Sequence, residues 1–202
     1  MGTRKNDWLG FYKEFKLHKA CADDDFRPAM KYICFKNGYA YATDAHIAVR
    51  ANLHDISALS QEDIDKLNGY LIHSSQFQLL LKYDTFEIGE GTITIIDSGL
   101  KARTTIQLVK LAASKDEELA TNCKNLYFPD VDAIINKDAE TGSLDSVGFN
   151  YQLLGRLLSA MGLKERVGLK FTGSGKQIFV VGAKEDLGVD VRGIIMPILL
   201  EV

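Results

Sequence analysis

An aspartate and a histidine two positions apart are the residues of this sequence best suited to acid–base or metal chemistry. Asp44 and His46 would point to the same face of a β-strand, as a metal site requires. No third ligand stands at a suitable spacing, because His18, His54 and His73 are scattered along the chain. We therefore expect Asp44 to stabilise a turn by bonding to nearby backbone amides. An enzyme built around Asp44 and His46 stays open as an alternative.

The other groups that suggest chemistry have simpler structural explanations. The run 23–25 is three aspartates without the spacing or downstream glutamate of an EF-hand, which indicates a solvated acidic loop. The run 173–176, Gly-Ser-Gly-Lys, lacks the spacing of a phosphate loop and indicates a hairpin turn. Cys21, Cys34 and Cys123 are far apart and form no CxxC pair, so neither a disulfide framework nor a cysteine zinc site is expected. With no other catalytic signature, we predict a non-enzymatic protein without a cofactor or metal.

The overall composition is that of an ordinary globular protein. The 202 residues are 46% hydrophobic and 25% charged, which allows one large domain or two small ones with a real core. No apolar run approaches the roughly 18 residues of a membrane span, and the polar N-terminus is no signal peptide, so we predict a cytoplasmic protein without membrane contact. The net charge of −3 argues against phosphate binding over the whole surface but permits a local basic face.

Sequence periodicity predicts mixed secondary structure. The firmest local feature is a hairpin around Asn37-Gly38, because both residues tolerate positive φ. Alternation and β-forming residues predict strands over 14–18, 30–35, 39–43, 46–50, 85–88, 92–96, 101–109, 167–171, 177–181 and 193–200. Capping residues and apolar stripes predict helices over 60–66, 76–83, 112–120 and 150–161, with a polar connector over 136–145.

A weak internal repetition indicates the fold class. Segments 74–96 and 150–181 both read as helix, strand, glycine turn and strand. Each unit would place an amphipathic helix on a small antiparallel sheet. Duplicated helix-on-antiparallel-sheet units predict an α+β architecture and not a doubly wound sheet.

Short motifs in four regions of the sequence, taken in order, resemble the bacterial DNA polymerase III beta subunit, the sliding clamp family. Arg27-Pro28 before the hairpin and the run 42–46 (Ala-Thr-Asp-Ala-His) after it resemble the middle clamp domain. The run 128–130 (Phe-Pro-Asp) resembles the end of that domain, 148–150 (Gly-Phe-Asn) the start of the last helix, and 195–199 the Met-Pro tail. The resemblance implies a DNA clamp-like fold in a reduced form, with a reduced clamp-like domain over 1–130 and a C-terminal half-domain over 131–202.

The resemblance also implies a groove for a hydrophobic partner peptide. Carried over position by position, its residues are Thr43, Ala45, His46, Ile47, Pro129, Ile134, Met196, Pro197 and Ile198. Ala45 stands where the family has glycine, and Ile47 where it has arginine, so we expect a different peptide preference. The alternative is that these apolar residues are ordinary core and terminal strand.

Helices line the DNA-facing surface of the family, and their basic residues contact phosphates without reading sequence. Lys82, Arg156 and Lys164 lie on or just after the two matching helices. They imply weak, non-specific binding of double-stranded DNA. We thus expect a non-catalytic, DNA-associated clamp-like protein that acts as a processivity or tethering factor in replication or repair. Its expected partners are DNA polymerase or other replication or repair proteins. We also expect that the protein can form a homo-oligomer. The alternative is a clamp-fold interaction scaffold that does not encircle DNA.

Overall fold

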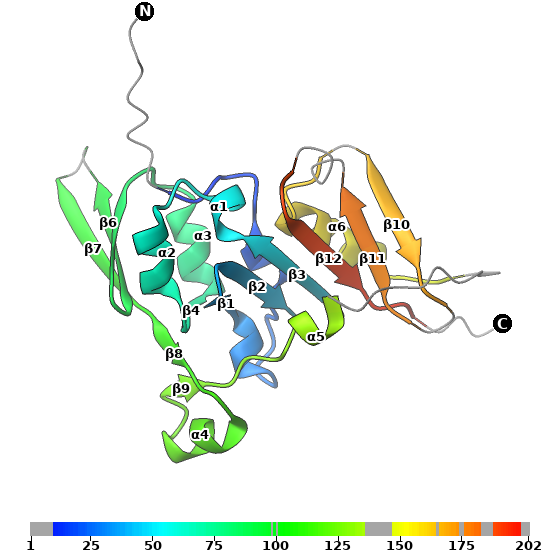
Figure 1. Ribbon diagram of the computed structural model, residues 1–202, viewed down its shortest axis with the longest axis horizontal. Coiled ribbons are helices and arrows are strands. Elements are labelled where there is room, and N and C mark those ends of the chain that lie inside the picture. Colours follow the sequence, from blue (N-terminus) through cyan, green and yellow to red (C-terminus); the bar gives the residue numbers. More distant parts are fainter. Residues whose placement is uncertain are drawn as a thin grey trace, which may run out of the picture.

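The computed structural model describes residues 10–97, 99, 101–135, 147–164, 166–173, 176–182 and 188–198. Over these residues the chain forms two antiparallel-rich sheets and several short helices (Figure 1), so the predicted α+β class is confirmed. None of the described helices is both long and apolar enough to span a membrane.

The larger sheet has nine strands among the described residues, in the order β10-β11-β12-β3-β2-β1-β4-β8-β9. In chain order these strands are β1 (Tyr32–Lys36), β2 (Tyr39–Thr43), β3 (Ile47–Asn52), β4 (Tyr70–His73), β8 (Val109–Leu111), β9 (Asn125–Leu126), β10 (Val167–Phe171), β11 (Ile178–Gly182) and β12 (Val191–Ile195). All neighbours are antiparallel except β8 and β9. Because β12 pairs with β3, the last described strand joins the N-terminal strands in one sheet.

The smaller sheet contains β5 (Phe86–Gly89), β6 (Thr92–Asp97) and β7 (Ala102–Gln107). The helices are α1 (Leu53–Ile56), α2 (Gln61–Leu67), α3 (Ser74–Leu80), α4 (Lys115–Ala120), α5 (Asp132–Ile135) and α6 (Tyr151–Ala160), with 3₁₀ helices η1 (Leu17–Ala20) and η2 (Pro28–Lys31). The predicted repetition holds in outline, since α3 precedes the antiparallel strands β5–β7 and α6 precedes β10–β12.

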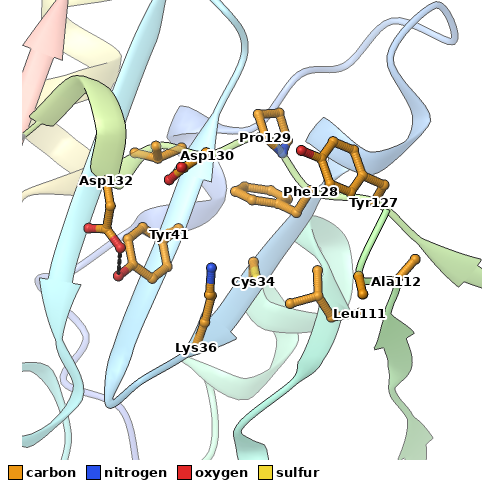
Figure 2. A pocket seen from close by; sticks show the side chains of 12 residues that line it. Cys34, Lys36, Tyr41, Leu111, Ala112, Tyr127, Phe128, Pro129, Asp130 and Asp132 are labelled. Carbon is orange, nitrogen blue, oxygen red and sulfur yellow. Dashed lines mark hydrogen bonds between the residues drawn. The ribbon is translucent and has the colours of Figure 1, made fainter. Parts of the chain in front are cut away.

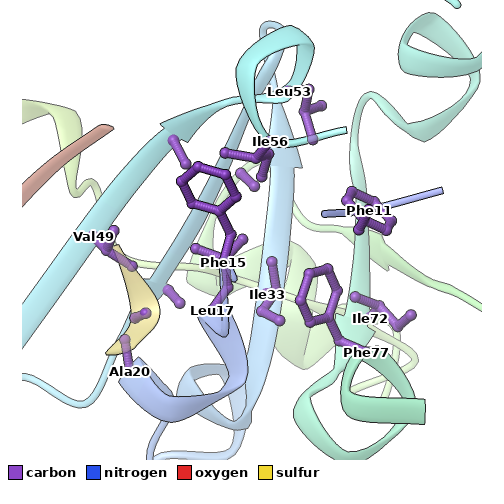
Figure 3. Packing of buried hydrophobic residues seen from close by; sticks show 14 of the residues in the cluster. Phe11, Phe15, Leu17, Ala20, Ile33, Val49, Leu53, Ile56, Ile72 and Phe77 are labelled. Carbon is purple, nitrogen blue, oxygen red and sulfur yellow. The ribbon is translucent and has the colours of Figure 1, made fainter. Parts of the chain in front are cut away.

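Alternation along the central strands separates two apolar clusters on opposite faces of the larger sheet. In β1, Ile33 and Phe35 point toward the main core, while Cys34 points to the other face. The main core is covered by α3, α6 and η1, and α5 packs on the opposite face against β3 and β12. Figure 3 shows Phe11 and Phe77 in this core, where their ring centroids are 4.9 Å apart.

Local signals in the sequence account for the hairpin and two of the helices. Asn37 and Gly38 have φ values of 52° and 79°, as the predicted turn requires. The side chain of Ser60 caps α2, and that of Asn150 caps α6. Gly162 follows α6 with a φ of 67°.

Other expected boundaries were wrong. Segment 14–18 contains no strand, because the chain turns there into η1 and buries Leu17 between α3 and α6. Segment 101–109 divides between β7 and β8, which belong to different sheets. The helix expected over 76–83 begins at Ser74 and is capped by the His73 side chain. The connector 136–145 and two residues of the expected 173–176 turn lie outside the described residues.

Candidate functional site

The turn between β2 and β3 is built around Asp44. Asp44 Oδ1 accepts hydrogen bonds from the backbone N–H of His46 (2.8 Å) and of Ile47 (2.9 Å). Thr43 Oγ1 donates to the Ile47 carbonyl (2.7 Å) and accepts from the Ala45 N–H (3.1 Å). These bonds hold Ala45 at a φ of 75°, which a non-glycine residue adopts only at a cost. The expected turn-stabilising role of Asp44 is confirmed.

Two arginines fasten this turn to the rest of the chain. Arg156 Nη1, from α6, lies 2.9 Å from Asp44 Oδ2, and the Asp44 side chain is almost completely buried. The other Arg156 nitrogens donate to backbone carbonyls, Nε to Lys19 (2.9 Å) and Nη2 to Cys21 (2.8 Å). Arg27 Nη1 donates to the Asp44 carbonyl (2.8 Å). The turn is therefore fixed from α6 and from the loop before η2.

The C-terminal strand lies against the same turn. The Met196 N–H donates to the His46 carbonyl (2.8 Å), and Ile195 is the register partner of Ile47. The Ile198 N–H donates to the Gly148 carbonyl (2.8 Å). Thus the structure places 43–47 and 196–198, which are far apart in sequence, side by side.

Three of the expected groove residues are large apolar side chains that remain exposed. Ile134, on α5, is 41% exposed, Met196 is 36% exposed and Ile198 is 51% exposed. Helix α5 packs against β3 and β12 and so brings Ile134 to the same end of the sheet. Ile47, in contrast, is only 1% exposed and belongs to the core. We call the surface formed by Ala45, His46, Ile134, Met196, Pro197 and Ile198 the groove, after the peptide groove that the sequence resemblance implies.

Pro129 borders a separate pocket with a volume of about 390 Å³, shown in Figure 2. Its lining includes Cys34, Lys36 and Tyr41 from the hairpin and Phe128, Pro129 and Asp132 from the segment leading into α5. Tyr41 Oη donates to Asp132 Oδ2 (2.7 Å). Burial and then this hydrogen bond raise the pKa of Tyr41, and burial raises the pKa of the Cys34 thiol to about 12, so both groups stay protonated near neutral pH.

Sequence reasoning missed this pocket. The only available signal was alternation along the hairpin, which places Cys34 and Tyr41 on the face opposite the main core. Nothing in the sequence spacing brings that face together with Asp132, which lies 91 positions after Tyr41.

The residues expected to contact DNA do not share one environment. Lys82 follows α3 and Lys164 follows α6, and both are exposed. All three kinds of nitrogen of Arg156 have protein partners, so its side chain serves the interior of the fold. In the part of the chain that is described, no group of three or more His, Cys, Asp or Glu side chains is arranged to hold a metal ion.

Comparison with known proteins identifies the fold. No protein-family model matches the sequence, and no curated protein matches it significantly. Among solved structures, the beta clamp of Helicobacter pylori bound to a DNA ligase peptide is 12% identical with a TM-score of 0.61, covering 95% of this chain and 65% of the clamp. The DnaN sliding clamp of Bartonella birtlesii bound to griselimycin is 14% identical with a TM-score of 0.60, covering 99% of this chain and 68% of the clamp.

The beta subunit of DNA polymerase III from Thermotoga maritima gives the same picture. It is 11% identical with a TM-score of 0.55, covering 96% of this chain and 65% of that subunit. The chain therefore spans about 65% of the length of the Thermotoga and Helicobacter proteins. At this level of identity the likeness establishes the fold, which is that of the DNA polymerase III beta subunit, the bacterial sliding clamp.

Proposed function

We propose that this protein acts by binding, without catalysis, and that its groove takes a short hydrophobic peptide from a DNA polymerase or another replication or repair protein. The proposal rests on one observation above all: Ile134, Met196 and Ile198 are exposed near a turn that α6, the loop before η2 and the C-terminal strand hold in place. A rigid apolar surface binds a peptide without first having to be ordered. A clamp of the same fold, that of Helicobacter pylori, has been solved with a DNA ligase peptide, which supports the same kind of partner.

The test is a titration of a fluorescently labelled hydrophobic peptide, followed by anisotropy. Met196→Asp and Ile134→Asp should each weaken binding at least about tenfold, because a charge would stand in the apolar contact. Leu119→Asp is the matched control, since Leu119 is 70% exposed on α4 and Figure 1 shows α4 well away from α5. If Met196→Asp and Ile134→Asp bound the peptide as tightly as the Leu119→Asp control and the wild type, the groove would be removed from the proposal.

Association with double-stranded DNA is the second candidate, favoured by exposed cations on the helical layer. Lys82 and Lys164 come shortly after α3 and α6, the matching helices of the two repeats. Lys16 and Lys19 are exposed at η1, which packs against both of those helices. Such a surface would contact phosphates without reading sequence and would act as a tether or processivity factor.

Retention on DNA at low salt tests this second candidate. The double variant Lys82→Glu, Lys164→Glu should elute from a duplex DNA column at lower salt than wild type, because two favourable phosphate contacts become repulsive. The double variant Lys110→Glu, Lys124→Glu makes the same charge change near α4 and should elute with wild type. Retention that neither variant alters would favour a scaffold that does not use DNA.

A further inference from the structure

A loop with three aspartates lies beside the groove. Segment 22–30, a loop that leads into η2, is closed at its base by a hydrogen bond from the Ala22 N–H to the Met30 carbonyl (2.9 Å). Within it, Arg27 Nη1 donates to the Asp44 carbonyl (2.8 Å), so the loop is attached to the turn that carries Ala45 and His46. We call Asp23, Asp24 and Asp25 of this loop the acidic rim.

The carboxylates of the acidic rim are only partly neutralised. Asp25 forms an ion pair with Lys31, which lowers the pKa of Asp25 and raises that of Lys31. Asp23 and Asp24 form no ion pair with another described residue, and Asp24 only accepts a hydrogen bond from the Phe26 N–H. The charges of both still raise the pKa of Lys31, so a single lysine faces three carboxylates.

Of the two arginines near the groove, only Arg156 has its charge paired with the carboxylate of a described residue. Arg156 is bound to Asp44 and to two backbone carbonyls, and Arg27 is bound to the Asp44 carbonyl. Asp130, two residues before α5, is exposed next to Pro129, and its carboxylate accepts a hydrogen bond from the Ala133 N–H. Arg27 and Lys31 therefore stand against four aspartates, Asp23, Asp24, Asp25 and Asp130, and the charge of these residues is negative on balance.

The same loop also presents an aromatic side chain to solvent. Phe26 directly follows the acidic rim and is 94% exposed, the largest value among the exposed large apolar residues that are described. An exposed phenyl ring beside carboxylates suits the long side chains of lysine and arginine, whose methylene groups cover apolar surface while the charged end reaches an anion. The acidic rim and Phe26 thus both suit a partner that presents lysine or arginine side chains.

We propose that the groove selects peptides in which lysine or arginine flanks the hydrophobic anchor, with the acidic rim as the determinant of that choice. This inference rests on the proposed peptide-binding function and names the class of peptide. Each pair at the exposed rim is weak and screened by salt, so selectivity comes from the sum of several pairs and is greatest at low ionic strength.

The test uses two labelled peptides with the same hydrophobic centre, one flanked by two lysines and the other by two glutamates. At about 0.05 M salt the basic peptide should bind about fivefold or more tighter, and at about 0.5 M salt the difference should nearly vanish. Asp23→Lys with Asp24→Lys should reverse the preference. Asp116→Lys with Glu118→Lys, on the first turn of α4, makes the same charge change elsewhere and should preserve it.

The outcomes separate this inference from the function on which it rests. If neither peptide binds at any salt concentration, the peptide-binding function itself fails. If both bind equally well, or if the preference survives in the Asp23→Lys, Asp24→Lys variant, the groove stands and the acidic rim is overturned as its determinant. Asp23 is exposed, Asp24 is half-buried, and neither makes an ion pair with a described residue, so the variant should fold, which circular dichroism would check.

Discussion

The carboxyl group of Asp44 connects parts of the chain that are far apart in sequence. One oxygen holds the backbone of the β2–β3 turn, and the other holds Arg156 on α6. Removing one member of a buried ion pair leaves the other without compensation, which costs more than the pair contributes in isolation. The shape of the groove therefore depends on a residue, Arg156, that does not line it.

A double-mutant cycle measures this connection. Asp44→Asn and Arg156→Gln should each lower the free energy of unfolding by about 1–3 kcal/mol. This is less than for a fully buried ion pair, because one third of the Arg156 side chain is exposed to water. The double variant should cost less than the sum of the two, by about 1–2 kcal/mol, since the remaining partner is no longer left with an unpaired charge. Urea denaturation followed by circular dichroism gives all four values.

The control for this cycle is the ion pair between Arg103 and Glu87, in which both side chains are mostly exposed. Its coupling should be close to zero because water screens exposed pairs. Comparable coupling in both cycles would mean that Asp44 and Arg156 interact as an ordinary surface pair and do not fix the turn.

At the scale of the elements, the sequence predicted what short-range signals determine. The hairpin follows from Asn37-Gly38, and α6 follows from its Asn150 cap, its leucine stripe and Gly162. Segment 14–18 alternates like a strand but forms no strand, because Leu17 is buried under α3 and α6 by contacts that alternation does not encode. Tertiary packing overrides local pattern most easily in such short segments.

In the candidate site, too, some features could be predicted from short sequence motifs and others depend on tertiary packing. The short motifs located the Asp44 turn and the Met196 strand, and pairing of β3 with β12 brings them together. The ion pair of Asp44 with Arg156 and the pocket of Cys34 and Tyr41 depend on three-dimensional proximity alone. No periodicity within one element could have indicated either feature.

Substitution of two glycines by alanine tests the surroundings of α6, because one substitution should lower the stability of the protein and the other should raise it. A Cβ added at Gly193 in β12 would lie 2.5 Å from Met161 Sδ and 3.0 Å from Leu157 Cδ1. Gly193→Ala should therefore destabilise the protein by about 1–3 kcal/mol through overpacking. A Cβ at Gly155, on α6 itself, would meet nothing within 4 Å, so Gly155→Ala should stabilise by about 0.5–1 kcal/mol through helix propensity.

Thermal and urea unfolding of the two alanine variants provide the measurement. Because both substitutions add one methyl group, their difference reports the local environment and not the size of the change. Stabilisation by Gly193→Ala would contradict the close contact of β12 with α6, since it would require room for a methyl group between them.

For the whole molecule, the pairing of β12 with β3 bears on whether the chain has one folding unit or two. A boundary near residue 130 remains a prediction from the sequence. The nine-stranded sheet of the described residues crosses that boundary, and Arg50 in β3 forms ion pairs with Asp132 (3.5 Å) and Asp190 (3.3 Å) beyond it. Continuous hydrogen bonding and a buried arginine paired across a boundary favour cooperative unfolding.

We therefore expect a single cooperative unit, and native-state hydrogen exchange tests it. Under mildly denaturing conditions, peptides from the β1–β2 hairpin and from β10–β11 should report the same free energy of opening. Ile195→Ala, which removes a side chain only 1% exposed in β12, should lower that free energy by about 2–4 kcal/mol in both regions, because the cavity weakens the main core, to which both contribute. If instead β10–β11 exchanged through an opening that left the hairpin protected, the C-terminal half would be a separate domain, and the groove would lie at a movable interface between two units.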